Sequence, residues 1–424
     1  MSLYSEASII IPPEPSVKAG GLSAIDVQNR GLSEFTVTRA LDTATRINEE
    51  GLIELVAANV PRIDFLDGIN NASLLVEPTR TNRITNSQTF ITTWSGANRT
   101  LTQNFGISPD GTTNSVKYTK NTGPNTVATI TQSSVFNTTG NHAFSIFIRN
   151  INSPTLILRA DSSGNTANLN FNTTTNTITE SGANLISSSS KVENYGNGWY
   201  RISGVANVTS TSWIFDVGTF QDGIGSEFEV WGAQVEVGNY VTSYIPTSGS
   251  TVTRNRDEIS LSNVSQLLGQ IEGALFIDYS LFDVTNSPST FFTLTDTNGP
   301  DYVLFGPNTS DKNRGLVVND STINVNITGT IIFDSNIYYR SLFNYKSGDS
   351  SIYMDGVVDK TDTSTFTPLS TVNKLNFDQG LNIIYGRIKS LLVYKTALDT
   401  EASEALTSYF TFEEIVSNKN YEIL

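Results

Sequence analysis

The sequence predicts an all-β protein with two β-sandwiches in tandem, an extended N-terminal arm and one short helix near the C-terminus. Three observations favour this fold class. Charged residues make up only 16% of the 424 residues, and Asn, Ser, Thr and Gly fill much of the remainder. That composition disfavours long exposed helices and suits strands joined by turns. Apolar and polar residues alternate along many short segments, and a single late segment has helical spacing.

The composition also argues against some classes of binding partner. The net charge is −15 and no local basic patch is visible, so a nucleic-acid backbone or an anionic membrane surface would be repelled. Cysteine is absent, so packing and strand pairing have to stabilise the fold without disulfides. The apolar run at residues 9–11 is too short for a membrane span. We expect neither a nucleic-acid partner nor membrane insertion.

The first 84 residues divide into two parts. Residues 1–33 have three prolines between positions 12 and 15 and little periodicity, which predicts an extended arm for attachment. Residues 34–84 predict a β-hairpin attachment region, with a turn at Gly51. A short strand at 74–76 follows, and Pro78 ends it. We expect Glu77 and Arg80 to form an ion pair across that break.

Residues 85–250 predict the first sandwich. The segment 142–150 has apolar side chains at every second position, as in a half-buried strand. In segment 227–238 the apolar alternation changes phase at Gly232, which predicts a β-bulge there. Many short strands with regular turns are typical of a β-sandwich.

Residues 251–424 predict the second sandwich, after a linker rich in Pro, Ser and Gly near residue 250. Asp355-Gly356 between β-rich flanks predicts a type I′ hairpin. The segment 397–410 has apolar residues at helical spacing, with Asp399 or Thr400 available as the N-cap.

Residues that could catalyse a reaction are sparse. The single histidine, His142, has no nucleophile in its surroundings and fits a polar residue near a turn better than a catalytic base. Glu227 and Glu229 share one strand face. A glycosidase needs two opposed carboxylates, whereas adjacent carboxylates on an exposed strand are usually solvated. We therefore predict no enzymatic activity.

Four tryptophans fall in the first sandwich, and flat aromatic rings can stack on the apolar faces of sugars. The candidate ligand-binding residues are Trp231, Trp199, Trp213 and Glu229. The alternative is that the tryptophans belong to the core. Trp231 is the strongest candidate because it lies opposite the face of Phe228 and Val230.

One loop offers oxygen ligands. Asp296, Asn298 and Asp301 surround a glycine, and such clusters can hold Ca²⁺. The loop lacks the distal Glu of a helix-loop-helix calcium site, so a plain turn is the alternative. Otherwise we expect no cofactor.

An ordered series of motifs resembles a known family. "SLLVEPTRTN", "ISPDGTTNSVKYTK", "NGWYRISG" and "WGAQVEVGNYVTSYIPTSGS" fall within residues 34–262. Together with the preceding "FTVTRALDTATRINEEGLIELV" they resemble bacteriophage fibre and receptor-binding structural proteins that carry a jelly roll similar to carbohydrate-binding modules. The C-terminal motifs "SIYMDGVVDK" and "GRIKSLLVYKTALDTEASEAL" resemble, more loosely, laminin-G and concanavalin A-like lectin sandwiches.

The resemblance implies a non-enzymatic subunit of a phage tail or head fibre. Such a subunit would be made in the host cytoplasm, attach to other virion proteins through its N-terminal arm, form a homotrimer and bind host-surface polysaccharide during attachment. In this hypothesis the lectin-like sandwich meets the glycan. Two alternatives stay open: a purely structural or decoration protein of the virion, and a polysaccharide depolymerase or other glycoside hydrolase.

Overall fold

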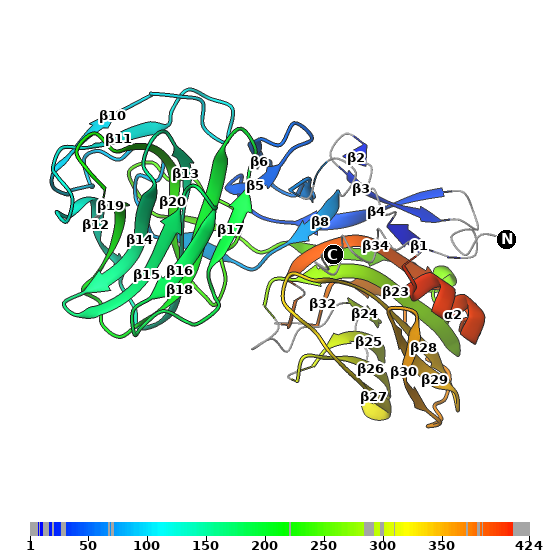
Figure 1. Cartoon of the computed structure of the whole chain (residues 1–424). Helices are drawn as coiled ribbons and strands as arrows, with labels where there is room; N and C mark the ends of the chain where they lie inside the picture. Colours follow the sequence, from blue (N-terminus) through cyan, green and yellow to red (C-terminus); the bar gives the residue numbers. More distant parts are fainter. Residues whose placement is uncertain are drawn as a thin grey trace. The chain divides into compact units, whose positions relative to one another are not determined.

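The computed structural model shows antiparallel β-structure with one α-helix among its described residues (Figure 1). The described residues are 7, 9–11, 17–18, 21–26, 31–66, 68, 72–219, 222–283, 292–296, 301–308, 310–369, 372–379, 382–383 and 385–409. The all-β fold class predicted from the sequence is confirmed. Within these residues, no helix has both the length and the apolar character needed to cross a membrane.

The chain forms two compact units. Unit 1 comprises residues 1–40, 58–78 and 256–424, and unit 2 comprises residues 41–57 and 79–255. The chain therefore passes between the units four times. This division differs from the expected consecutive segments 1–33, 34–84, 85–250 and 251–424.

Long-range strand pairing explains the difference. Strand β8 (Ser73–Val76), expected in the attachment region, pairs with β34 (Gly386–Tyr394) near the other end of the chain. Strand β4 (Gly31–Thr38) likewise pairs with β22 (Glu258–Ser262). Segments from the N-terminal region thus complete the sheets of the C-terminal sandwich. A division based on position in the sequence cannot show such pairs.

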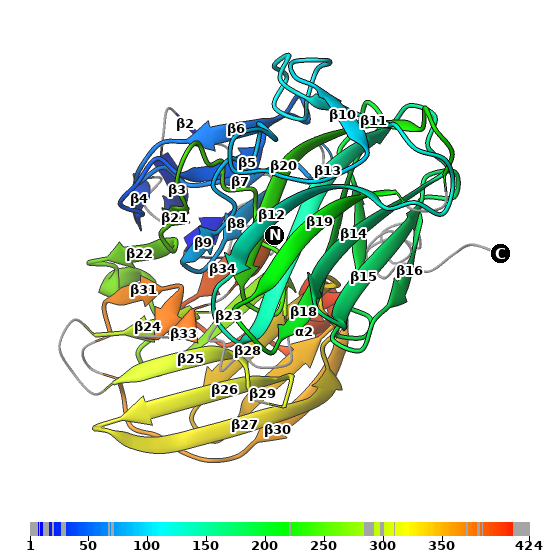
Figure 2. The same ribbon diagram turned by 90° about the vertical axis from the view of Figure 1, so that its left-hand side faces the viewer.

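Unit 2 contains two antiparallel sheets (Figure 2). The six-stranded sheet has the order β10 (Arg99–Thr102), β11 (Val116–Lys120), β20 (Glu227–Val237), β13 (Gly140–Asn150), β18 (Trp199–Val208) and β17 (Lys191–Asn194). The five-stranded sheet has the order β12 (Ala128–Phe136), β19 (Trp213–Thr219), β14 (Thr155–Ser162), β15 (Asn165–Asn172) and β16 (Thr177–Ser181). Alternate residues of both sheets, such as Phe144 and Leu158, form one buried core. This is the packing of a β-sandwich.

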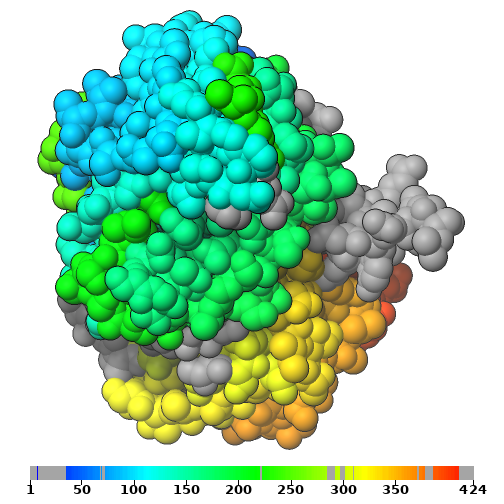
Figure 3. Space-filling model, turned by 60° about the vertical axis from the view of Figure 1, so that its left-hand side comes forward, coloured from blue at the N-terminus to red at the C-terminus, as the bar shows by residue number. Residues whose placement is uncertain are grey.

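Smaller elements complete unit 2. Strands β5 (Ala44–Ile47) and β6 (Ile53–Val56) form the predicted hairpin, and Gly51 in its turn has a φ of 77°. Strand β9 (Arg80–Asn82) pairs with β21 (Val252–Arg254), which joins the two ends of the main segment of the unit. In the space-filling view a green segment lies among cyan ones, so distant parts of the sequence share one surface of unit 2 (Figure 3).

The predicted bulge at Gly232 is confirmed. Ser145 pairs with Gln234 and Phe147 pairs with Trp231, so one extra residue lies in β20 between these pairs. Gly232 itself has a φ of 62°, in the left-handed region that glycine adopts at low cost. The bulge keeps Phe228, on one side of it, and residues beyond it in the same core.

Unit 1 is built from two groups of strands joined through β4. The first group places β23 (Glu272–Leu281) between β28 (Tyr338–Lys346) and β34, with β29 (Ser350–Met354) and β30 (Val357–Asp362) beyond β28. The second group runs β22, β31 (Lys374–Asn376), β24 (Phe292–Thr295), β25 (Tyr302–Pro307), β26 (Lys312–Asn319) and β27 (Thr322–Ile332). Side chains from both groups, including Ile277 and Phe305, form one core.

The expected N-terminal arm requires a correction where the structure describes it. Strand β1 (Ile9–Ile11) pairs with β34 and with β3 (Gly21–Asp26), and β3 pairs with β2 (Val17–Lys18) and with β4. Their backbone groups are therefore taken up in the sheets of unit 1. The prolines between positions 12 and 15 lie outside the described residues, but the strands described before and after them, β1 and β2, are both paired.

Two local predictions for the C-terminal region are confirmed. Met354 pairs with Val357 across a two-residue turn, in which Asp355 and Gly356 both have positive φ, as a type I′ turn requires. Helix α2 (Thr400–Thr407) begins at Asp399, whose side chain accepts a hydrogen bond of 2.8 Å from the Ala402 N–H.

The expected ion pair between Glu77 and Arg80 is wrong. Glu77 is bound instead by Arg62, at 2.6 Å. The Nε of Arg80 lies 3.8 Å from Glu236, and its guanidinium lies over the ring of Tyr240. The reason is topological, because the chain leaves unit 1 and enters unit 2 between the two residues that were expected to pair.

Candidate functional site

The tryptophans proposed as sugar-stacking residues are buried. Trp213 and Trp231 have no exposed surface, and Trp199 is 2% exposed. A ring that stacks on a sugar must present a face to solvent. The structure therefore assigns these three indoles to packing and removes them as stacking surfaces.

Trp231 lies opposite the Phe228 face, as expected, but a second layer covers it. Its ring packs against Phe147 at 5.4 Å and against Tyr244 at 4.6 Å between centroids. Tyr244 belongs to the segment that follows β20, and its hydroxyl is bound to Ser87. The alternation of residues along β20 correctly placed Trp231 and Phe228 on opposite faces of the sheet. It could not show that a loop covers the face of Trp231.

Arg149 contacts both Glu229 and Trp199, and all three residues lie on the six-stranded sheet. Arg149 holds the Glu229 carboxylate through two contacts of 2.8 Å, and its guanidinium lies 5.0 Å from the centre of the Trp199 ring. Ser115 donates a further hydrogen bond to Glu229, which is 3% exposed. The partners of Glu229 thus belong to the protein itself. Glu227 is bound by Lys117 at 3.0 Å, so these two carboxylates do not face each other across a cleft.

The predicted calcium ligands are only partly described. Asn298 lies outside the described residues. The carboxylate of Asp301 is buried and accepts a hydrogen bond of 2.8 Å from the Asp320 N–H, while the Asp296 N–H donates to the Asp301 carbonyl at 3.4 Å. Among the described residues no group of three His, Cys, Asp or Glu side chains could hold a metal ion. A Ca²⁺ site at this loop stays a prediction.

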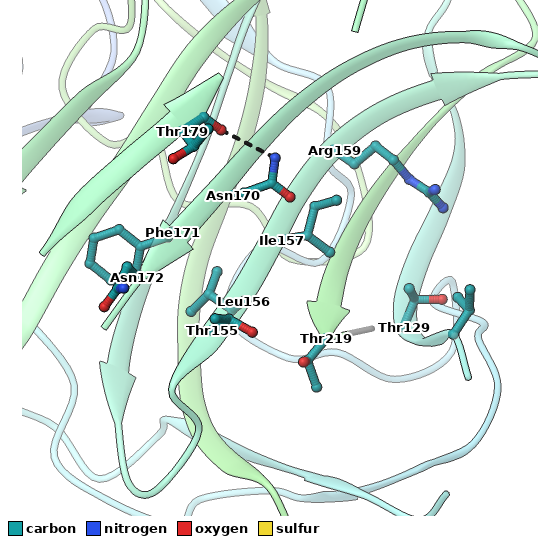
Figure 4. A pocket seen from close by; sticks show the side chains of 11 residues that line it. Thr129, Thr155, Leu156, Ile157, Arg159, Asn170, Phe171, Asn172, Thr179 and Thr219 are labelled. Carbon is teal, nitrogen blue, oxygen red and sulfur yellow. Dashed lines mark hydrogen bonds between the residues drawn. The ribbon is translucent and has the colours of Figure 1, made fainter. Parts of the chain in front are cut away.

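A pocket of about 500 Å³ lies instead on the five-stranded sheet of unit 2 (Figure 4). Hydroxyl and amide side chains contribute most of its polar lining, with one guanidinium and a few apolar groups beside them. The described lining residues are Val127, Thr129, Thr155, Leu156, Ile157, Arg159, Asn170, Phe171, Asn172, Thr179 and Thr219. The pocket has the size typical of small-ligand sites.

Strand alternation explains this lining. Leu156 and Leu158 of β14 point into the core, so Ile157 between them lies on the opposite face. On the next strands, Asn170 pairs with Ile157 on one side and Gly218 pairs with it on the other. A Cβ at Gly218 would lie 2.0 Å from the Ala128 carbonyl oxygen, so the missing side chain lets the backbone of β12 approach closely here.

The amide of Asn170 has a defined position at the pocket. Its Nδ2 donates to the Thr179 carbonyl at 3.2 Å (Figure 4). The same Nδ2 donates to the Ser181 hydroxyl at 3.1 Å, and both acceptors lie on β16. Asn170, Asn172 and Thr179 are all exposed. The Asn172 Oδ1 accepts hydrogen bonds from the Thr174 and Thr175 N–H groups, whereas its Nδ2, the Asn170 Oδ1 and the Thr179 hydroxyl could bind a ligand rich in hydroxyl groups.

The guanidinium of Arg159 is the one charged side chain among the described lining residues. It lies 2.5 Å from Asp216 on β19 and 3.5 Å from Asp161 on its own strand. The alternation of Asn168, Asn170 and Asn172 was visible in the sequence and could have signalled a polar sheet face. Nothing in the sequence showed which strands lie beside it.

Neither a protein-family model nor a curated protein matches the chain. Several solved structures match parts of it. The CBM40 domain of the Ruminococcus gnavus IT-sialidase, bound to α2,3 sialyllactose, is 10% identical with a TM-score of 0.30, over 33% of this chain and 84% of that chain. Domain 4 of AbnA, a GH43 extracellular arabinanase from Geobacillus stearothermophilus in complex with arabinotriose, is 15% identical with a TM-score of 0.30, over 40% and 84%.

Domains LG4-5 of the mouse laminin alpha1 chain are 9% identical with a TM-score of 0.24, over 69% of this chain and 92% of that chain. Two of these three proteins were solved with a bound carbohydrate. At such low identities and TM-scores, the likeness carries no argument about what this chain binds. The candidate site therefore depends on its own geometry.

Proposed function

We propose that this chain is a carbohydrate-binding protein whose binding site is the pocket on β14, β15 and the neighbouring strands of unit 2. The observation that carries the proposal is the mixed lining of the pocket, in which hydroxyl and amide side chains lie beside apolar ones on the strands of one sheet. Amide and hydroxyl side chains at fixed strand positions match the hydroxyl groups of a sugar. Ile157 and Val127 between them offer apolar contact for the C–H faces of a sugar ring.

We further propose that binding occurs without turnover. Glycosidases position two carboxyl groups on either side of the scissile bond. Among the described lining residues of the pocket there is no carboxylate and no imidazole. The nearby Asp216 accepts hydrogen bonds from Arg159 and Thr131, which favours a structural role.

A virion fibre subunit that binds host-surface polysaccharide is the biological role we propose for this activity. The ordered motifs across residues 34–262 support it. In a homotrimer, three weak sites would act together and raise the overall affinity. Attachment to other virion proteins would then use the surface of unit 1, because the described N-terminal strands are part of its sheets.

The binding proposal is tested on the full chain, because a fragment of residues 263–424 would lack β4, β8 and β22. Gel electrophoresis through a panel of purified bacterial surface polysaccharides should retard the protein in at least one gel. We expect Asn170→Ala to weaken that retardation at least tenfold. Asn168→Ala is the matched control, because Asn168 lies on the same strand, bonds to the same Ser181 hydroxyl and is not a lining residue.

Two outcomes would contradict the proposal. The first is no retardation in any gel, or equal retardation of both asparagine variants and the wild type. The second is release of new reducing ends from the bound polysaccharide, which would show turnover. The virion role is tested separately with antibodies against the chain: they should label purified phage particles, and a label confined to the free protein fraction contradicts it.

A further inference from the structure

At one end of the pocket, negatively charged side chains outnumber positively charged ones. Arg159 is 25% exposed at its side chain, and its Nη2 contacts the carboxylates of both Asp216 and Asp161. Asp216 is 2% exposed and also accepts a hydrogen bond from Thr131 on β12. Because Asp216 is held from two sides, it keeps its place beside the guanidinium. One cation therefore faces two carboxylates.

The other end of the pocket has a similar arrangement. The Thr155 hydroxyl donates a hydrogen bond of 2.8 Å to Asp222, and Ser153 donates to the same carboxylate. The Nζ of Lys120 lies 2.8 Å from the Asp222 backbone carbonyl, so one buried cation accompanies this carboxylate. Lys120 is not among the lining residues. Among the described residues at the two ends of the pocket, each positive charge therefore has a carboxylate beside it.

We infer that the pocket selects uncharged sugars over sugars that carry carboxylate or sulfate groups, and that the contact of Arg159 with Asp216 and Asp161 determines this specificity. The inference rests on the proposed function. An acidic sugar would approach a guanidinium whose charge Asp216 and Asp161 already balance, and Asp161, which is 22% exposed, would repel it. A neutral sugar meets no such repulsion, because amide and hydroxyl groups bind its hydroxyls directly.

The test compares one polysaccharide in two charge states. A uronic-acid polysaccharide and its carboxyl-reduced form have the same linkages, but the reduced form has neutral hexoses in place of uronates. Binding of the full chain to several such pairs is measured by affinity electrophoresis at low salt. We expect at least tenfold tighter binding to the reduced form, and a smaller difference in 0.5 M salt, because salt screens the repulsion.

Variants of the two carboxylates show whether they cause the preference. Asp216→Asn keeps the shape of the side chain but removes one negative charge, so we expect the preference for the neutral form to fall at least fivefold. Asp161→Asn, at a partly exposed position, should also reduce the preference for the neutral form. This variant replaces Asp216→Asn in the test if the change at the buried position prevents folding. Asp362→Asn in unit 1 removes one charge elsewhere and should leave the preference unchanged.

The outcomes separate this inference from the function on which it rests. Tighter binding to the acidic form, or a preference that both aspartate variants leave unchanged, overturns the inference while the binding function stands. Binding of neither form of any pair, together with no retardation in the wider panel, overturns both. Loss of neutral-form binding in Asn170→Ala, with the preference of the wild type as expected, supports both.

Discussion

The guanidinium of Arg62 lies 2.6 Å from the carboxylate of Glu77, and both side chains are buried in unit 1. Asp257 contacts the same guanidinium, and Arg39 lies 2.7 Å from Asp257. Burial alone would lower the pKa of Arg62, but the attraction of Asp257 and Glu77 raises it above its ordinary value. In the sequence, each of these four residues lies within five positions of one of the four points where the chain passes between the units. The cluster fixes each of these segments within unit 1.

Glu77→Gln should therefore destabilise unit 1 strongly. Removal of one partner from a buried ion pair leaves a charge without full compensation, and such changes cost about 3 to 5 kcal/mol. Urea unfolding of the full chain should show a lower midpoint for one transition. Lys346→Ala is the control, because Lys346 pairs with Glu272 at 3.9 Å on the surface of the same unit and should change stability by less than about 1 kcal/mol. Equal effects of both variants would contradict the structural role of the cluster.

Gly232→Ala should destabilise unit 2. A Cβ at this position would lie 2.8 Å from the Phe147 ring, and the φ of +62° strains any other residue. We expect a loss of about 2 kcal/mol or more in the free energy of unfolding. Gly223→Ala is the matched control, because a Cβ there meets nothing within 4 Å; it should change stability by less than about 1 kcal/mol. A tolerated Gly232→Ala would mean that the bulge is not fixed.

His142 should make unit 2 sensitive to mild acid. The imidazole is buried between the Gly140 carbonyl and the Thr138 hydroxyl, each 3.1 Å from a ring nitrogen. Burial lowers the pKa of His142 below 6.5, and the charge of Arg83 acts in the same direction, while the Gly140 carbonyl opposes both. The unfolded chain therefore takes up a proton before the folded chain does, so stability falls as the pH drops below about 6.5.

Urea midpoints of the unit 2 transition measured between pH 8 and pH 5 test this prediction. His142→Gln should flatten the fall relative to the wild type, because glutamine does not titrate. Parallel curves for the two proteins would show that other groups cause the acid sensitivity.

Sugar binding should leave the tryptophan fluorescence unchanged. All four indoles are buried, Trp94 being the most exposed at 7%, and none is a described lining residue of the pocket. The emission maximum and intensity at saturating polysaccharide should equal those of the free protein. A shift of the emission maximum or a loss of intensity that disappears in Trp199→Phe would contradict this prediction and indicate that Trp199 lies at the ligand site.

Local features of this fold could be predicted from the sequence, whereas its long-range strand pairs could not. The bulge at Gly232, the turn at Asp355-Gly356 and the helix start at Asp399 were predicted because a few adjacent residues determine each of them. The strand that pairs with β8 was not predicted. Alternation shows that a strand is half-buried, but it does not show which other strand pairs with it. The expected boundaries at residues 33 and 84 therefore differ from the units of the structure, whereas the one near residue 250 lies close to the division at 255–256.

The candidate site was missed for a related reason. Residue type drew attention to Trp231 and Glu229, but loops that cover the second face of the six-stranded sheet bury both. The polar stripe of Asn168, Asn170 and Asn172 lies on the other sheet, and the pocket there also requires Thr129 and Thr219, which come from strands distant in sequence. Only the assembled sheet brings these groups to one pocket.

The most direct test of the account is hydrogen–deuterium exchange of the full chain with and without a polysaccharide that retards it. Binding at the pocket should slow exchange in β14 and β15, residues 155–162 and 165–172, and in Asn170→Ala the protection should disappear. Protection confined to the strands of unit 1, or the same protection in the variant, would contradict the claim that this sheet face of unit 2 is the carbohydrate-binding site.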